Sequence, residues 1–163
     1  MTNEEKEVIR DLKARTVYEL QQENHSFYLE NYKDALVDTD VRIASYCFSV
    51  IDNPEKHNVY EVLGVRRFFK MLDKFAWDKK KVKQFFKLYE ILKLSGTSGR
   101  RRYKLTPIQC FQFANIYGLK DANGKRLIRT AYIFVPRKFS KTTSAAVMAV
   151  YDMLFGDNNA QAY

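Results

Sequence analysis

The stretch YIFVPRKFSKTTSAAVMAVYDMLFG, residues 132–156, decides the fold that the sequence predicts. It joins a run of β-branched and aromatic residues to a short basic segment, a Lys–Thr pair and a run with helical spacing. Phosphate-binding loops occur where a strand leads through a tight turn into a helix, because the helix N-terminus presents backbone N–H groups to the phosphate. The question is whether VPRKFSKTT, residues 135–143, forms such a loop.

The loop pattern GxxxxGK[ST] is matched only at its end. If Lys141 and Thr142 are the final pair, the two glycine positions fall at Val135 and Ser140. Ser140 is small enough for close phosphate approach, but a positive φ would strain it where glycine would not be strained. The strand before the turn, the helix after it and the absence of nearby acids favour a phosphate loop. The alternative is an ordinary basic strand-to-helix turn.

The rest of the chain is mostly helical by its spacing of apolar residues. It predicts helices over residues 3–23, 27–52 and 59–75, and a strongly basic one over 77–94. A further helix begins at Thr106 and Pro107 and is closed by Gly118, and an Asn-Gly turn follows. Residues 127–135 predict a central strand, and a last helix runs from Thr142 to about Leu154.

The segment SGTSGRRRYK, residues 95–104, interrupts all periodicity and predicts a domain boundary. The expected organisation is a helical lead-in domain over 1–95, a basic linker over 96–104 and the start of a P-loop ATPase domain over 105–163. The fold class is thus a mainly α lead-in followed by the opening part of an α/β P-loop NTPase core. Its parallel sheet would be incomplete, because each parallel neighbour needs a full crossover. We therefore expect the front part of a longer protein.

The net charge of +9 is unevenly distributed. Residues 1–63 carry 7 basic and 13 acidic side chains, residues 64–104 carry 14 and 3, and residues 105–163 carry 7 and 3. The basic block in the middle favours a polyanionic partner, nucleic acid first, or else a solvated helix face. The aromatic residues in the same helices have the spacing of a buried core rather than of a base-stacking surface.

Composition, the length of apolar runs and cysteine spacing exclude several classes of protein. Hydrophobic residues make up 46% of the chain, which is too many for intrinsic disorder. No apolar run approaches the roughly 20 residues of a membrane span, and the acidic N-terminus does not resemble a signal peptide, so the cytoplasm is expected. Cys47 and Cys110 are not spaced like metal ligands, so we expect both to be buried free thiols.

Together, LTPIQCFQFANIYG at residues 105–118 and the segment 129–157 resemble the start of the ATPase domain in large terminase subunits of tailed phages, the motors that package DNA. The resemblance lies in a Leu-x-Pro-x-Gln segment and in a deviant Walker A loop of the type V-P-R-K-x-G-K-[ST]. It is specific over residues 100–163 and weaker over 27–99. Ser140 departs from the family, which usually has glycine there.

The resemblance implies ATP and Mg²⁺ as cofactors and assigns the following roles. Gln109 would bind the adenine edge, Lys141 the phosphates and Thr142 the magnesium ion. Arg137 would stabilise charge on the transferred phosphoryl group as a catalytic residue. The remaining loop residues would support nucleotide binding: Lys138, Ser140 and Thr143.

Three basic residues in the glycine-flanked linker are expected to contact the DNA backbone: Arg100, Arg101 and Arg102. The family further implies double-stranded DNA, a small terminase subunit, a portal protein and other copies of the chain as partners. No strand ending in Asp-Glu follows the loop, so this chain alone is expected not to hydrolyse ATP. Two alternatives remain: a basic helical nucleic-acid-binding protein without nucleotide function, and a prophage remnant or adaptor that binds a motor subunit.

Overall fold

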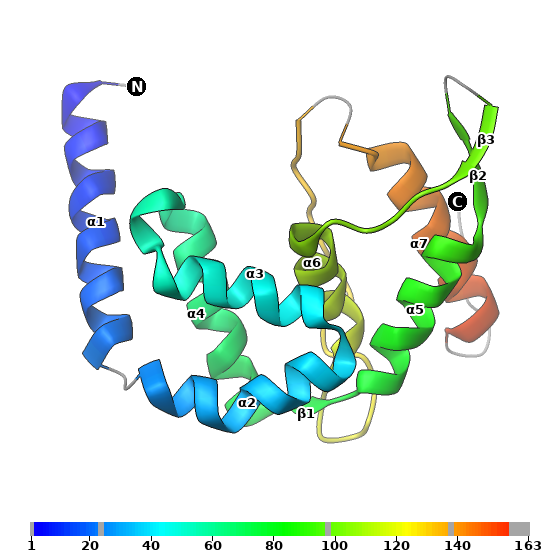
Figure 1. The fold of residues 1–163 in the computed structure, drawn as a ribbon, viewed down its shortest axis with the longest axis horizontal. Helices are drawn as coiled ribbons and strands as arrows, with labels where there is room; N and C mark the ends of the chain where they lie inside the picture. Colours follow the sequence, from blue (N-terminus) through cyan, green and yellow to red (C-terminus); the bar gives the residue numbers. More distant parts are fainter. Residues whose placement is uncertain (1, 23–24, 97–98, 137–138, 157–163) are drawn as a thin grey trace.

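The structure is a computed structural model that describes residues 2–22, 25–96, 99–136 and 139–156. It is mostly helical (Figure 1). The α-helices are α1 (Asn3–Gln22), α2 (His25–Thr39), α3 (Val41–Asp52), α4 (Val59–Lys74), α5 (Lys79–Ile91), α6 (Pro107–Gly118) and α7 (Lys141–Phe155), with a 3₁₀ turn at Pro54–Lys56. The strands are β1 (Ala76–Trp77), β2 (Lys93–Gly96), β3 (Gly99–Arg102) and β4 (Leu119–Lys120).

The predicted helix over 27–52 is two helices with a break at Asp40. This residue has an extended backbone with φ −165° and ψ 124°, and its carboxylate accepts a hydrogen bond from the backbone N–H of Arg42 at 2.9 Å. An Asp that caps a new helix in this way satisfies a donor that the helix itself leaves free. The predicted helices over 3–23, 59–75, 106–118 and 142–154 are confirmed to within a few residues.

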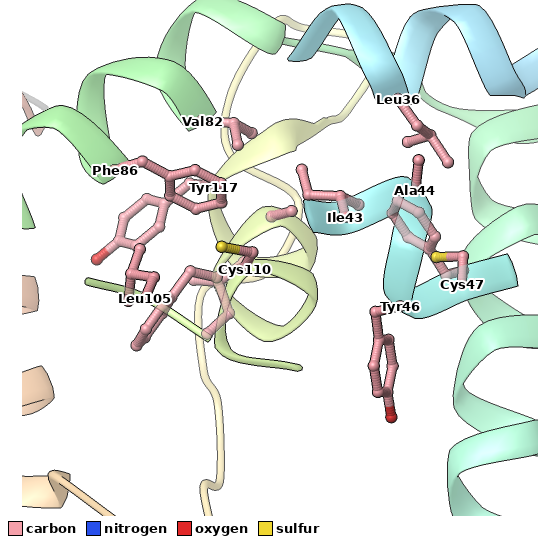
Figure 2. Close-up of a cluster of buried hydrophobic side chains, with 14 of the residues drawn as sticks. Leu36, Ile43, Ala44, Tyr46, Cys47, Val82, Phe86, Leu105, Cys110 and Tyr117 are labelled. Carbon is pink, nitrogen blue, oxygen red and sulfur yellow. The ribbon is translucent and has the colours of Figure 1, made fainter. Parts of the chain in front are cut away.

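Helix α6 lies at the centre of the molecule and packs against both α3 and α5 (Figure 1). Figure 2 shows side chains of these three helices converging around the buried thiol of Cys110. Ile43 contributes from α3 and Phe86 from α5. The hydrophobic core therefore includes residues from before and after the basic segment 96–104.

The aromatic residues of the basic helices belong to this core, as their spacing predicts. Phe68, Phe69 and Phe85 are fully buried. The ring of Phe85 stacks on Tyr117 of α6 with centroids 4.4 Å apart, and meets Tyr151 of α7 edge to face at 5.2 Å. Buried ring pairs of this kind fill space between α5, α6 and α7, so these rings are not available to stack on bases.

The prediction of a parallel P-loop sheet is wrong. The described strands form two small antiparallel pairs, β1 with β4 and β2 with β3. The segment 95–104, which the sequence analysis treated as a linker, contributes to the second pair as a hairpin. Among the described residues there is no parallel pairing at all.

The strand predicted over residues 127–135 is also wrong. In this segment Tyr132 and Phe134 are 90% and 85% exposed, and the backbone joins no sheet. β-branched and aromatic residues favour an extended chain, but a strand exists only when a neighbouring strand supplies hydrogen-bond partners. Only its first residue bonds to a strand: the N–H of Leu127 donates to the carbonyl of Leu119 in β4 at 2.9 Å, next to an isolated antiparallel bridge between Arg126 and Lys120.

The division into domains at 96–104 stays a prediction, although α6 shares one core with the helices before it.

The first helix packs on α4, and Glu19 forms an ion pair of 2.8 Å with Arg66. On α1 two apolar residues are exposed, Val8 at 66% and Leu12 at 43%. Within the described part of the chain, none of the helices is both long enough and apolar enough to cross a membrane.

Candidate functional site

A pocket of about 180 Å³ joins two regions that the sequence analysis selected separately. Gln109 of α6 lines it from one side, and Lys141 at the start of α7 from the other. Apolar side chains form most of the remaining wall: Phe113, Ile133, Val135, Phe139, Ala145 and Met148. We call this cavity the Gln109–Lys141 pocket. It is smaller than the roughly 300–1,000 Å³ of drug-sized ligand sites, so it has room for a ring rather than for a whole nucleotide.

Ser140 stands immediately before α7 in a left-handed conformation, with φ 59° and ψ 28°. It is the only non-glycine residue with positive φ among those that the structure describes. An L-residue in this region costs about 1–2 kcal/mol, which glycine avoids. This is the backbone conformation that the sequence predicts would strain Ser140.

The first turn of α7 has donors without helical partners. The first helical hydrogen bond runs from the N–H of Ser144 to the carbonyl of Ser140 at 2.8 Å, and the Ser140 side chain makes no capping hydrogen bond. Earlier N–H groups at any helix start lack intrahelical acceptors. Lys141 and Thr142 are exposed and Thr143 is half-buried, so this turn offers amides, one cation and two hydroxyls to a ligand.

Gln109 has a local role in its own helix. Its Oε1 accepts from the N–H of Thr106 at 3.0 Å, and the Thr106 hydroxyl accepts from the Gln109 N–H at 3.4 Å. This reciprocal pair is a capping box. The residue is 8% exposed. Because the amide oxygen is used by the cap, the amide nitrogen is the group that remains for a ligand in the pocket.

Ser144 also lines the pocket, and the sequence analysis missed it. Its Oγ lies 3.1 Å from the hydroxyl of Tyr89 on α5, and burial raises the pKa of this tyrosine. The hydrogen bond anchors the first turn of α7 to the core. The sequence could have indicated Ser144 as a site residue, since it lies one helical turn after Lys141. Phe113 and Met148 became known as lining residues only from the tertiary structure.

The side chains of four predicted site residues lie outside the described part of the chain. Arg137 and Lys138 lie outside the described residues, and so do the side chains of Arg100 and Arg101. Arg102 lies in β3 with an exposed side chain. The structure places Gln109 and Lys141 on the wall of one pocket that neither Ser140 nor Arg102 lines.

The two cysteines are free and buried, as predicted. Burial raises the pKa of the Cys110 thiol to about 12 and that of Cys47 further still, so both remain protonated near neutral pH. Within the described ranges there is no group of three or more His, Cys, Asp or Glu side chains that could hold a metal ion.

No protein-family model matches the chain, and the comparisons with curated proteins and with solved structures give no match either.

Proposed function

We propose that the chain is the N-terminal part of a large terminase subunit, which uses ATP to package double-stranded viral DNA in the host-cell cytoplasm. The observation that carries the proposal is the Gln109–Lys141 pocket, which unites the glutamine and the lysine that the family resemblance selected. These residues are 32 positions apart in the sequence, and both line the pocket. The small subunit, the portal and further copies of the chain are proposed partners on the resemblance alone.

The chemistry of the pocket suits a nucleotide in two parts. An apolar wall with one amide donor fits a purine ring, because the ring faces are apolar and the ring edge accepts hydrogen bonds. The uncapped start of α7 and the exposed Lys141 suit the phosphates, which carry negative charge and need N–H donors. When bound, ATP would supply the phosphoryl group and Mg²⁺ would neutralise part of its charge.

Titration with a fluorescent ATP analogue tests the proposal, with and without Mg²⁺. We expect weak binding that Mg²⁺ strengthens, and Lys141→Ala should weaken it about tenfold or more because a charge-assisted contact is worth about 1.5–3 kcal/mol. Lys125→Ala is the matched control, since it removes an equally exposed lysine from a turn outside the pocket. No binding at millimolar analogue, or equal losses in the two variants, would contradict the proposal.

Gln109→Glu gives a sharper test of the ring-binding end. Glutamate keeps the acceptor of the capping box, so α6 should remain intact, but it removes the amide donor. We expect nucleotide binding to weaken while circular dichroism and the unfolding transition stay unchanged. If nucleotide affinity is unaltered in the folded variant, Gln109 is a helix cap and no more.

Arg137 is proposed as the catalytic residue of the complete motor on the resemblance alone. A side chain that meets charge developing in the transition state affects turnover more than binding. We therefore expect Arg137 to contribute to turnover by the assembled protein.

A second candidate is a basic helical nucleic-acid-binding protein without nucleotide function. The specific observation in its favour is the excess of basic residues over 64–104, 14 against 3 acidic ones. Both candidate functions have nucleic acid as a partner. They differ in the expected result of the nucleotide titration, because the second predicts no binding of the ATP analogue.

A further inference from the structure

Helix α5 has an outward face composed of lysines. Lys80, Lys83 and Lys87 are spaced three and four residues apart and are exposed. The opposite face is buried in the core through Val82, Phe85, Phe86 and Tyr89. At about 1.5 Å of rise per residue the three lysines span about 10 Å on one side of the helix.

The β2–β3 hairpin continues this charge beyond the end of α5 (Figure 1). Lys93 and Arg102 are directly paired across the two strands, and both are exposed. The next two pairs match Leu94 with Arg101 and Ser95 with Arg100. Like charges directly opposite each other weaken a hairpin, so these strands gain nothing for their own stability from the paired cations.

Many other cations of the basic block already have partners inside the molecule. Arg66 pairs with Glu19, and Lys79 has a short ion pair with Asp38. Lys81 donates to the carbonyl of Phe155 at 2.9 Å. By contrast, Lys80, Lys87, Lys93 and Arg102 form no ion pair with any described residue, and Lys83 reaches Asp38 only at 3.7 Å.

We infer that Lys80, Lys83, Lys87, Lys93 and Arg102 form one cationic surface, the α5–hairpin surface, that binds the phosphate backbone of duplex DNA. The inference rests on DNA as the partner in the proposed function, and it assigns the contact to one helix face and one hairpin. It narrows the sequence prediction, which gave the whole basic block over 64–104 a nucleic-acid partner and named the three consecutive arginines within it. Most of the unpaired cations on this surface are lysines outside that run.

The surface is suited to the backbone rather than to bases. A lysine is a point charge on a flexible stem, and it neutralises phosphates without reading sequence. Duplex DNA carries one negative charge per about 1.7 Å of its axis, so a surface of this length meets phosphates along its whole extent. We therefore expect binding that is independent of sequence and strongly dependent on salt.

Fluorescence anisotropy with a labelled duplex of about 20 base pairs tests the inference over a series of salt concentrations. The helix variant carries Lys80→Gln, Lys83→Gln and Lys87→Gln; the hairpin variant carries Lys93→Gln and Arg102→Gln. The control variant carries Lys6→Gln, Lys33→Gln and Lys125→Gln, which removes three exposed cations from other parts of the molecule. Each variant is first checked by circular dichroism for its helix content.

We expect the slope of log K against log salt to become shallower by about one for each lost phosphate contact, so by about three in the helix variant and two in the hairpin variant. The control variant should change the slope by less than one. Equal losses in the helix and control variants would overturn the inference, because general charge would then explain the binding. It would also be overturned if the unmodified chain failed to bind duplex at low salt, or bound single strands in preference.

The nucleotide titration separates this inference from the proposed function. Helix and hairpin variants should bind the ATP analogue as the unmodified chain does, since none of the five residues lines the Gln109–Lys141 pocket. If DNA binding fails while nucleotide binding persists, only the surface is wrong. If nucleotide binding fails while the surface binds DNA, the surface stands and the second candidate function is favoured.

Discussion

Gly118 ends α6 with its backbone against the indole ring of Trp77. A Cβ atom at this position would lie 2.2 Å from a ring carbon of Trp77. The ring is itself held by a hydrogen bond of 3.0 Å from its Nε1 to the hydroxyl of Thr39, and by an edge-to-face contact with Phe68. Glycine is therefore required here by close packing, whereas the sequence indicated it only as a helix end.

Gly118→Ala should destabilise the protein by about 1–3 kcal/mol, because the indole must move within a packed core. Urea unfolding followed by tryptophan fluorescence measures this, and Trp77 is the single tryptophan of the chain. Gly64→Ala is the matched control, since no atom lies within 4 Å of a Cβ at that position in α4. That substitution should stabilise the helix by about 0.5–1 kcal/mol. A Gly118→Ala protein as stable as the unmodified chain would contradict the packing argument.

Several ion pairs and hydrogen bonds of charged side chains occur at the start of α3. Arg42 donates from its Nη2 to Asp40 at 2.7 Å and from its Nη1 to the carbonyl of Leu105 at 3.1 Å, and it also pairs with Glu90. These contacts connect α3 to the end of α5 and to the chain entering α6. The guanidinium lies over the ring of Phe86 at 5.7 Å, so the cluster is anchored on the core.

Burial acts to raise the pKa of Asp40, but hydrogen bonds from the side chain and backbone of Arg42 outweigh it, and the pKa lies below its ordinary value of 3.8. A lowered pKa means that the ionised group stabilises the folded state fully above about pH 4 and loses this contribution as the pH falls through the folded value. Asp40→Asn keeps a good N-cap but removes the charge. We expect it to be less stable at pH 7, and the difference from the unmodified protein to shrink toward pH 3.

Urea unfolding at several pH values measures this effect. Asp34→Asn is the control, because Asp34 is exposed on α2 and has no ion pair among the described residues. The argument fails if Asp40→Asn and Asp34→Asn show the same pH dependence.

For the whole molecule, the main question is whether residues 1–95 and 105–163 are separate units. Helix α6 fills the space between α3 and α5 with buried side chains, among them Phe113 and Cys110. A chain cut after residue 95 would expose that apolar surface to water. We expect the 1–95 fragment to unfold without a sharp transition in urea, although its helices remain partly formed by circular dichroism. A cooperative transition in the fragment would support the two-domain division predicted from the sequence.

Sequence spacing alone determined most of the helices, the N-cap at Thr106, the buried aromatic face of α5 and the buried thiols. The predicted glycine cap at Gly118 is wrong, because Gly118 is the last residue of α6 and Leu119 is its C-cap. These features depend on residues within a few positions of each other, or on a one-sided apolar pattern that requires burial somewhere. The break at Asp40 could have been read from its capping chemistry, but the continuous apolar pattern on both sides concealed it. For Ser140, the sequence indicated only that a positive φ would be strained, and the structure showed that the residue has one.

Only the tertiary structure decided which segments meet. Residues 127–135 have the composition of a strand, yet they belong to neither sheet, because beyond Leu127 no strand supplies hydrogen-bond partners. The reverse holds for residues 95–104, where glycines suggested a linker and cross-strand pairing produced a hairpin. The meeting of Gln109 with Lys141, and the separation of paired from unpaired cations on α5, depend on how α5, α6 and α7 pack. Packing is a long-range property, because each contact depends on residues far apart in the chain, and no local pattern encodes it.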